Sequence, residues 1–451
     1  MSILQRIMIS LAAVSLLLAA CSGSGTPAVP AAKPTDTPPP SSSPIPPSAT
    51  LAPPTDTPVP PTPTLTMVPP MTKSLDEITY QNLFRDYLGK TDAEIQAKLD
   101  DAWQHFFYGS DDYERVYYPV GDDMAYIYDV GSGDVRSEGM SYGLMISVQM
   151  DKQAEFNRIW KWAKTYMYQS DGPYKGYFAW HNKITGEKLH ANPASDGEEW
   201  FITALFFASA RWGDGEGIFN YRQEAQAILD AMRTKTAEDN GIATDMFDPV
   251  ARQVVFVPSG RNATFTDPSY HLPAYYELWA RWADKDNAFW AEAANASRLF
   301  FRKAAHPQTG LMPDYAEFDG RPHGSDEHKD FRFDAWRTLS NVAVDHAWFG
   351  ADPWQVEQSN RVLAFLASQG VNSYSNQYSL DGKALSGDHS TGLVAMAAVA
   401  ALAADENTGK PFVQALWDVS VPSGKWRYYD GMLYLLGLLH VSGNFKIYAP
   451  G

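Results

Sequence analysis

Two acidic residues in this chain could carry out acid–base chemistry together. Glu138 lies in the segment Ser-Glu-Gly-Met-Ser-Tyr-Gly at 137–143, and Asp334 lies in Phe-Asp-Ala-Trp-Arg at 333–337. Each stands where a polar and aromatic turn runs into an apolar stretch of helical periodicity. Cleavage of a sugar–sugar bond needs one protonated carboxyl, which gives its proton to the leaving oxygen, and a second carboxyl that is ionised. From this pair of carboxyls we take glycosidic cleavage as a hypothesis and test it against the rest of the sequence.

The local sequence around each carboxyl also has a purely structural explanation. Glu138 is flanked by Gly, Ser, Met and Tyr, and such semi-apolar surroundings raise the pKa of a carboxyl, which suits a general acid. A glutamate in the first turn of a helix is equally stabilised by the free amides there. Asp334 precedes Arg337 by three residues, which is the spacing of an ordinary ion pair within a helix.

Three further residues are candidates for sugar binding. Asp196 lies in Ser-Asp-Gly-Glu at 195–198, which also matches a capping box at the start of a helix. Tyr270 follows an Asp-Pro pair at 267–268 that reads as an N-cap with proline at the first helical position, so it could be an ordinary first-turn residue. Trp180, in Gly-Tyr-Phe-Ala-Trp-His at 176–181, could belong to the core. Only the conjunction of these residues favours a catalytic site.

Composition narrows the class of partner. The net charge is −17, which argues against nucleic acid and against anionic lipids or polymers as binding partners. A neutral substrate fits better. Aromatic residues make up 13% of the chain, and we expect some of their rings to line a binding surface.

Neither a metal nor a cofactor is expected. The chain contains no Gly-rich phosphate loop of useful form, and the acidic stretch 324–330 lacks EF-hand spacing. The histidines are scattered without ligand spacing; they include His190, His271, His306, His323, His328 and His346.

The first part of the chain is typical of an exported lipoprotein. Residues 1–20 combine a positive start, a short apolar run and small residues, as a signal peptide does. Cys21, the only cysteine, follows Leu-Ala-Ala like the lipidated cysteine of a lipobox, although an incidental cysteine near a cleavage site is the alternative. Residues 21–71, rich in Pro, Thr and Ser, are expected to be a disordered linker. We therefore expect a lipid-anchored, extracytoplasmic protein whose catalytic domain is 72–451, without any other membrane contact.

The main domain is expected to be all-α. Amphipathic periodicity predicts roughly 11 to 13 helices, joined alternately by short turns and by long polar loops, with 253–257 as the best candidate for a strand. This pattern suits six helical hairpins in an (α/α)6 barrel, with function in the long loops at one end. A solenoid is the competitor, although no fixed sequence period supports it. We expect a monomer. The predicted helical ranges are 91–107, 155–167, 198–210, 221–232, 273–283, 288–302, 339–349, 354–368, 391–403 and 431–439.

The motifs occur in an order that resembles glycoside hydrolase family 8. Besides those quoted above, they include Pro-Ala-Ser-Asp-Gly-Glu-Glu at 193–199, Asp-Pro-Ser-Tyr-His at 267–271 and Arg-Tyr-Tyr-Asp at 427–430. The likeness extends from about 75 to 449 and is greatest to the reducing-end xylose-releasing exo-oligoxylanases of that family. It implies an (α/α)6 barrel, an inverting mechanism and a β-1,4-linked substrate, namely neutral xylo-oligosaccharides.

The resemblance also implies a role for each matching residue. Glu138 corresponds to the general acid and Asp334 to the general base. In an inverting enzyme a water lies between the base and the sugar, so we predict that their carboxyls are roughly 6.5 to 9.5 Å apart. The remaining implied roles are distortion of the sugar at the cleavage point by Asp196, a share in holding the attacking water by Tyr270, ring stacking by Trp180, and sugar binding by Arg337 and Tyr429.

The loop at 385–391 bears on exo or endo action. In the relatives that it resembles, a histidine in such a loop reads the reducing-end hydroxyl, and His389 is the matching residue. Ser390 stands where these relatives have proline, and proline fixes a kink that serine does not. Phe333 stands where some endo-acting members have tyrosine.

Three alternative functions remain open from the sequence. The first is an endo-acting relative on xylan, cellulose or chitosan. The second is a lipid-anchored protein that binds oligosaccharides without cutting them. The third, a polysaccharide lyase on a similar barrel, is disfavoured by the overall acidity because its uronate substrates are anionic.

Overall fold

The computed structural model describes residues 74–238 and 241–450 of the 451-residue chain. All of these residues belong to one compact unit. The expected signal peptide, the lipidation site Cys21 and the expected linker at 21–71 lie outside the described residues. Among the residues that are described, no helix is both long enough and apolar enough to span a membrane.

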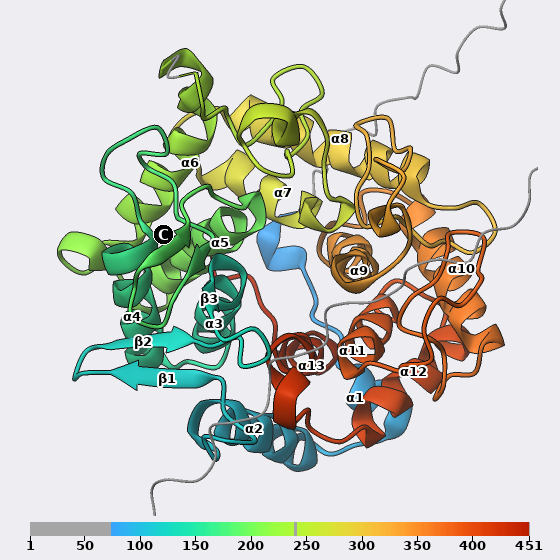
Figure 1. Ribbon diagram of the computed structural model, residues 1–451. Helices are drawn as coiled ribbons and strands as arrows, with labels where there is room; N and C mark the ends of the chain where they lie inside the picture. The colour runs from blue at the N-terminus through green and yellow to red at the C-terminus, as the bar shows by residue number, and fades with distance from the viewer. Residues whose placement is uncertain (1–73, 239–240, 451) are drawn as a thin grey trace, which may run out of the picture. The chain divides into compact units, whose positions relative to one another are not determined.

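Twelve of the α-helices in the described residues form the barrel. Figure 1 shows how they are arranged in two concentric rings. The chain alternates between the rings, so that each outer helix is followed by an inner one, and the last inner helix, α13, packs against the first, α3. The inner helices are α3 (Ser137–Gln149), α5 (Ser195–Trp212), α7 (Pro273–Trp282), α9 (Arg337–Phe349), α11 (Thr391–Ala400) and α13 (Arg427–Val441). The outer helices are α2 (Asp92–Tyr108), α4 (Gln153–Trp162), α6 (Tyr221–Glu238), α8 (Asn287–Ala304), α10 (Trp354–Ser368) and α12 (Glu406–Asp418). This is the (α/α)6 barrel that the sequence predicted.

Hydrophobic patterning separates the two rings. The inner helices are buried on nearly all sides: α11, for example, is buried from Gly392 to Ala400. The outer helices are amphipathic, with one buried face; α2 buries Ile95, Leu99 and Phe106 and begins with the predicted capping box of Thr91 and Glu94. Packing against both neighbours and the outer ring leaves an inner helix almost no face exposed to solvent.

The remaining elements are short and lie mostly in the connections. The helix α1 (Leu83–Leu88) precedes the barrel. The strands are β1 (Tyr117–Val120), β2 (Met124–Ile127), β3 (Val135–Arg136), β4 (His181–Asn182) and β5 (Lys188–His190), paired antiparallel as β1-β2 and β3-β4-β5. The single turns are η1 (Leu75–Glu77), η2 (Ala163–Met167, π-helical), η3 (Gly217–Phe219), η4 (Gly260–Thr264), η5 (Pro268–Tyr270), η6 (Glu327–Lys329), η7 (Phe333–Trp336) and η8 (Gly424–Trp426).

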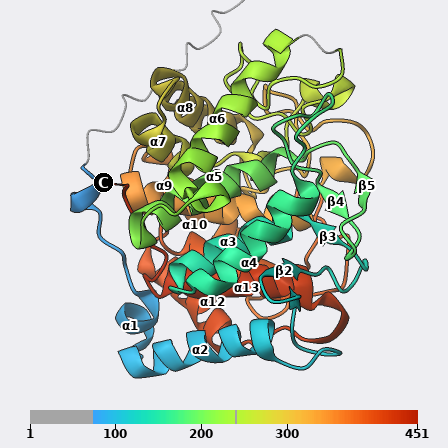
Figure 2. The same ribbon diagram turned by 90° about the vertical axis from the view of Figure 1, so that its left-hand side faces the viewer.

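The long connections gather at one end of the barrel. In Figure 2 the strands β3, β4 and β5 lie at one end of the helices, and α1 and the C-terminus lie towards the other. The predicted strand at 253–257 is wrong, because only Val254 forms an isolated bridge, with Phe247. The neighbouring backbone groups bond to different segments instead, Val255 to Met246 and Phe256 to Phe265, so no continuous ladder forms.

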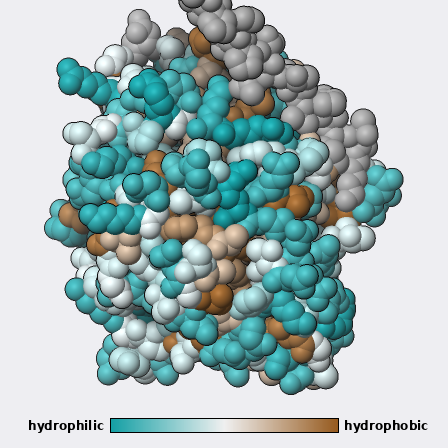
Figure 3. All heavy atoms as spheres, turned by 90° about the vertical axis from the view of Figure 1, so that its right-hand side faces the viewer, coloured by the Kyte–Doolittle hydropathy of each residue, from teal (hydrophilic) through white to brown (hydrophobic). Residues whose placement is uncertain are grey.

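The face shown in Figure 3 is mostly hydrophilic, and its hydrophobic atoms occur in separate small patches. The large cavity of the molecule is at the loop end of the barrel, where it is described next.

Candidate active site

A cavity of about 750 Å³ collects the residues that the sequence singled out. It is lined by loops and by the first turns of inner helices, because the chain enters each inner helix from the loop end. Seven of the eight predicted sugar-binding and catalytic residues line it, and Arg337 lies buried directly behind them. The seven are Glu138, Trp180, Asp196, Tyr270, Asp334, His389 and Tyr429.

Glu138 is a mostly buried acid at the second position of α3, with 16% of its side chain exposed. Burial raises the pKa of Glu138 to about 7, Arg337 opposes this increase, and the negative charges of Asp334 and Asp196 add to it. The hydroxyl of Tyr428 donates a hydrogen bond to Oε1 at 3.0 Å. Near neutral pH this carboxyl can hold a proton and release it to a leaving group.

Arg337 is the cation around which the site is built. Its Nη1 lies 3.1 Å from a carboxylate oxygen of Glu138 and 3.1 Å from one of Asp196, and its Nη2 lies 3.3 Å from Oδ1 of Asp334. Both nitrogens also donate to hydroxyls, that of Tyr142 at 2.5 Å and that of Ser269 at 2.9 Å. The ion pair between Asp334 and Arg337 that the spacing suggested is present, but it is one part of a larger arrangement.

Asp196 is nearly inaccessible, and burial raises its pKa to about 6. The capping box that the sequence suggested for this segment is wrong. The helix α5 begins at Ser195, whose hydroxyl donates to the carbonyl of Val255, and Glu198 accepts a hydrogen bond from the backbone of Phe178. The side chains of Ser195 and Glu198 therefore form their hydrogen bonds with neighbouring segments and not with the first turn of α5.

Asp334 differs from the other two carboxyls because one third of its side chain is exposed to the cavity. It lies in η7, directly after Phe333, whose φ of 22° falls in the left-handed region that non-glycine residues avoid. The hydroxyl of Tyr429 donates to the carbonyl of Phe333 at 3.1 Å and lies 3.5 Å from Oδ1 of Asp334. Strained backbone of this kind is common where a functional side chain is held in place.

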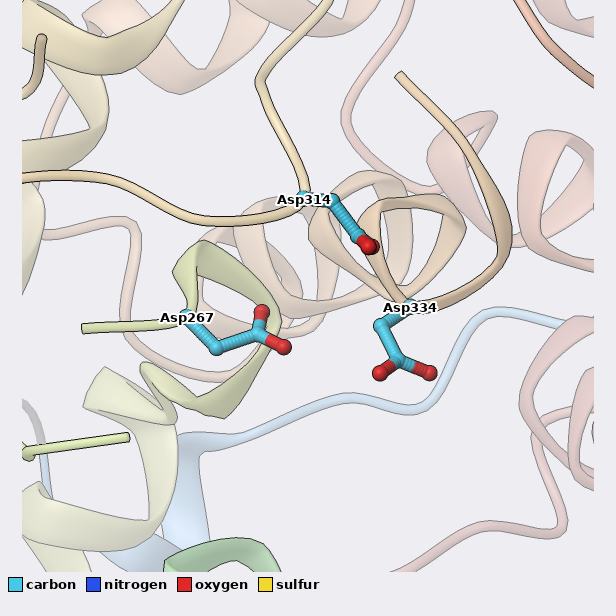
Figure 4. A group of neighbouring side chains, drawn as sticks. All are labelled: Asp267, Asp314 and Asp334. Carbon is cyan, nitrogen blue, oxygen red and sulfur yellow. The ribbon is translucent and has the colours of Figure 1, made fainter. Parts of the chain in front are cut away.

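Two buried aspartates stand beside Asp334, as Figure 4 shows. One oxygen each of Asp267, Asp314 and Asp334 lie within 4.8 Å of one another. Burial raises the pKa of Asp267 well above its ordinary value and that of Asp314 to about 6. Like charges at this separation disfavour simultaneous ionisation, so the fully buried Asp267 holds a proton, and Asp334 is the most exposed carboxyl of the three. Asp314 also pairs with Nδ1 of His328 at 2.6 Å.

Three other predicted residues surround this centre. Tyr270 is buried, with its ring 5.6 Å from the guanidinium of Arg337. Trp180 presents its ring next to those of His181 and His190. Nδ1 of His389 donates to the carbonyl of Tyr374 at 2.8 Å.

The sequence interpretation did not identify Tyr428, Tyr142, Asp314 or His328 as site residues. Tyr428 lies beside Tyr429 in the motif at 427–430, so the sequence could have indicated it as a site residue. Asp267 was recognised only as an N-cap, which it is, since it accepts a hydrogen bond from the backbone of Ser269 at 2.7 Å. Asp314 and His328 carry no local signal, because only the folded loops bring them to Asp334.

The arrangement contains the parts of an acid–base glycoside hydrolase: a protonated carboxyl, a more exposed one across the same guanidinium, and aromatic rings on an open cavity. The sequence profile of the glycosyl hydrolases family 8 matches residues 128–443, and the chain belongs to this family.

Characterised relatives cover nearly the whole domain. The chain is 48% identical to a reducing-end xylose-releasing exo-oligoxylanase of Paenibacillus barcinonensis over 83% of this chain and 98% of that one. A reducing-end xylose-releasing exo-oligoxylanase of Halalkalibacterium halodurans is 42% identical over 82% of this chain and 95% of that one. A solved family 8 xylobiose complex from Teredinibacter turnerae superposes with a TM-score of 0.79 at 50% identity, covering 82% of this chain and 98% of that one.

Proposed function

We propose that this glycoside hydrolase cleaves β-1,4 linkages of short xylo-oligosaccharides with inversion and releases xylose from the reducing end. The relatives that are 48% and 42% identical carry this activity in their names. One observation supports the chemistry above all others: Glu138 has a pKa raised to about 7 by burial, while Asp334, one-third exposed, meets the other nitrogen of the same guanidinium.

In this proposal Glu138 is the general acid. Its proton passes to the glycosidic oxygen as the bond from that oxygen to the anomeric carbon breaks. Asp334 is the general base and takes a proton from the water that attacks the anomeric carbon from the opposite face. After one turnover Glu138 is ionised and Asp334 is protonated, and exchange with solvent restores both. The carboxyl separation of roughly 6.5 to 9.5 Å that leaves room for this water stays a prediction.

The other residues bind and orient the sugar. Asp196, neutralised by Arg337, accepts hydrogen bonds from the sugar at the cleavage point and favours its distorted form. Tyr270 shares the attacking water with Asp334, and Trp180 offers a stacking surface. Tyr429 supports the backbone that carries Asp334. His389 reads the hydroxyl of the reducing-end sugar.

Product analysis tests this proposal. Purified protein is incubated with xylotriose and with xylan, and the products are followed by anomer-resolved NMR. We expect xylose and a shortened oligomer with inverted configuration, and little change in the polymer. Rapid loss of xylan viscosity would favour an endo-acting enzyme. Absence of any hydrolysis, together with oligosaccharide binding, would favour a binding protein.

We also propose that Cys21 carries a lipid and that the linker at 21–71 holds the catalytic domain outside the cytoplasm. The support is the signal-like stretch at 1–20 and the Pro- and Thr-rich composition that follows. Fractionation of cells that express the wild type and Cys21→Ala tests this. The substitution should move the protein from the membrane to the soluble extracytoplasmic fraction.

A further inference from the structure

His389 is held by a single neighbouring segment, 374–378. Its Nδ1 lies 2.8 Å from the carbonyl oxygen of Tyr374, and its ring meets the ring of Tyr374 edge to face at 4.5 Å. A carbonyl oxygen can only accept, so Nδ1 carries the hydrogen. The other ring nitrogen, Nε2, is therefore the one left for a substrate hydroxyl in the cavity.

The loop that carries His389 has little packing of its own. Residues 383–389 are exposed, apart from the half-buried Ser386, and a side chain at Gly387 would meet no atom within 4 Å. Burial therefore does not determine where this loop lies. The position of the loop depends on its hydrogen bonds to the neighbouring segment at 375–377.

Asn376 makes the hydrogen bonds on both sides of His389. Its backbone N–H donates to the carbonyl of Asp388 at 2.8 Å, and its side-chain Nδ2 donates to the hydroxyl of Ser390 at 2.7 Å. Asn376 itself is only 4% exposed. A buried residue thus holds the residues that immediately precede and follow His389.

The same residue is tied to the turn that contains Asp334. The carbonyl of Asn376 accepts a hydrogen bond from the indole N–H of Trp336 at 2.9 Å, and Trp336 is a fully buried member of η7. Asn376 therefore connects the turn of Asp334, the proposed base, to the loop of His389, the residue proposed to contact the leaving sugar. The distance between these two groups decides how many sugars fit between the cleavage point and the end of the cavity.

We propose that Asn376 is a positioning residue for reducing-end specificity. Its side chain holds Ser390, and through it His389, close enough to η7 that the leaving-group side admits one sugar with a free reducing end. The inference rests on the proposed exo activity and extends it to a residue that does not itself perform chemistry. Ser390 is the second member of this pair, because its hydroxyl accepts the hydrogen bond of Asn376 where the loop enters α11.

A competing role for Asn376 is direct contact with the sugar. Its Oδ1 is buried and has no hydrogen-bond partner among the described residues, and Asn376 lines the cavity. The two roles differ in what they predict for Ser390. If Asn376 acts by holding the loop, removal of either partner has the same effect; if it binds the sugar directly, Ser390 is dispensable.

The test compares xylotriose with its methyl glycoside, in which the reducing end is capped. The variants are Asn376→Ala, Ser390→Ala and the double substitution. Ser379→Ala is the matched control, because Ser379 lies at the distal turn of the same hairpin, where it bonds to Asp381 and Lys383. The readouts are kcat/KM on both substrates, the products from xylan, and the melting temperature.

We expect the wild type to prefer the free reducing end. Each single variant should lower this preference about five-fold, the effect of losing one hydrogen bond. The double variant should match the single ones, because both remove the same contact. Ser379→Ala should leave the preference unchanged.

Failure of the proposed exo function and failure of the positioning role of Asn376 give different results. If the wild type accepts the capped substrate equally well and cuts xylan internally, the proposed exo function is wrong and the inference falls with it. If the wild type discriminates but Ser390→Ala does so equally well, the exo function stands and the positioning role of Asn376 is wrong. The positioning role is also wrong if the effects of the two substitutions add. If Asn376→Ala does not fold, Ser390→Ala alone tests the positioning role. Ser390 is not buried, so this variant should fold.

Discussion

Nη1 of Arg337 lies 3.1 Å from Oε2 of Glu138, and the pKa of Glu138 is nevertheless raised to about 7. The same guanidinium also faces Asp196 and Asp334. One positive charge cannot neutralise three carboxylates, and burial penalises each additional negative charge. Glu138 therefore retains a proton beside an arginine, and the cation serves to hold the three carboxyls in place.

The first prediction concerns the pH dependence of catalysis. Glu138 must be protonated to act, so kcat/KM on xylotriose should be maintained below pH 7 and should fall as the pH rises through about 7. A profile measured from pH 5 to 9 checks this. A descending limb more than about one unit above pH 7 would contradict the assignment of Glu138 as the acid.

The raised pKa of Glu138 also contributes to stability. The folded state binds this proton more tightly than the unfolded chain does, so the contribution is fully present below pH 4.5 and is lost as the pH rises through about 7. In Glu138→Gln this loss is absent. Urea unfolding at pH 5.5 and 8 should show a smaller decrease in stability for the variant than for the wild type.

The second prediction concerns Tyr428. Its hydroxyl donates to Oε1 of Glu138 at 3.0 Å, which favours the ionised carboxyl. Tyr428→Phe should therefore raise the pKa of Glu138 and move the descending limb of the pH profile to higher pH. The ring is kept, so folding should be little affected. A limb that stays in place or moves to lower pH would show that this hydrogen bond does not tune the acid.

The third prediction separates catalysis from binding. Asp334→Asn removes the proposed base from a side chain that is one-third exposed, so the fold should tolerate it. We expect kcat to fall by about 10² to 10⁴, while calorimetry still detects xylo-oligosaccharide binding. Retention of most activity would assign the base elsewhere, with Asp314 of the same carboxyl cluster as the alternative.

The fold and the acid–base pair were largely predictable from the sequence. Helical periodicity predicted helices of both rings, but it did not tell the rings apart. In the structure the two layers differ in how many faces they bury, and α11 is buried from Gly392 to Ala400. Glu138, Asp196, Asp334 and Arg337 lie in short motifs at the starts of inner helices, which converge at one end of the barrel.

The rest depended on contacts between segments far apart in the chain. Asp314 and His328 lie in irregular loops, and nothing local indicates that they end beside Asp334. The residues at 253–257 have the composition of a strand, but their backbone partners belong to several segments. Ser195 and Glu198 match a capping box, yet tertiary partners at Val255 and Phe178 take both side chains.

The fourth prediction concerns the charge balance around Arg337. Arg337→Met leaves three carboxyls without their cation, and breaking a buried ion pair in this way costs about 3 to 5 kcal/mol. The freed carboxyls of Glu138 and Asp196 can relieve the cost by binding protons, so the loss in free energy of unfolding should be smaller at pH 5.5 than at pH 7.5. Urea denaturation at both values measures it.

Arg321→Met is the matched control for Arg337→Met. Arg321 pairs with Asp319, but their side chains are 75% and 53% exposed, so solvent screens the pair and the variant should unfold at nearly the same urea concentration as the wild type at either pH. An equal loss at pH 5.5 and 7.5 for Arg337→Met would contradict the role of this arginine in charge neutralisation and indicate a packing role.

The fifth prediction follows from the glycine that comes after the acid. A Cβ at Gly139 would lie 2.5 Å from Cε2 and 2.6 Å from the hydroxyl oxygen of Tyr428, so only glycine leaves room for this ring against α3. Gly139→Ala should displace Tyr428, break its hydrogen bond with Glu138 and destabilise the protein by about 1 to 3 kcal/mol. Because Gly139 lies within a helix, alanine alone would otherwise be favourable there.

Two comparisons isolate the clash at Gly139. Gly387→Ala, where a Cβ meets nothing within 4 Å, should leave the unfolding free energy almost unchanged. In the Tyr428→Ala background, Gly139→Ala should lose most of its cost, because the atoms it strikes are gone, so the two substitutions should be strongly non-additive. Additive losses in urea unfolding would mean that Gly139 is required for another reason and that the ring of Tyr428 is held by other contacts.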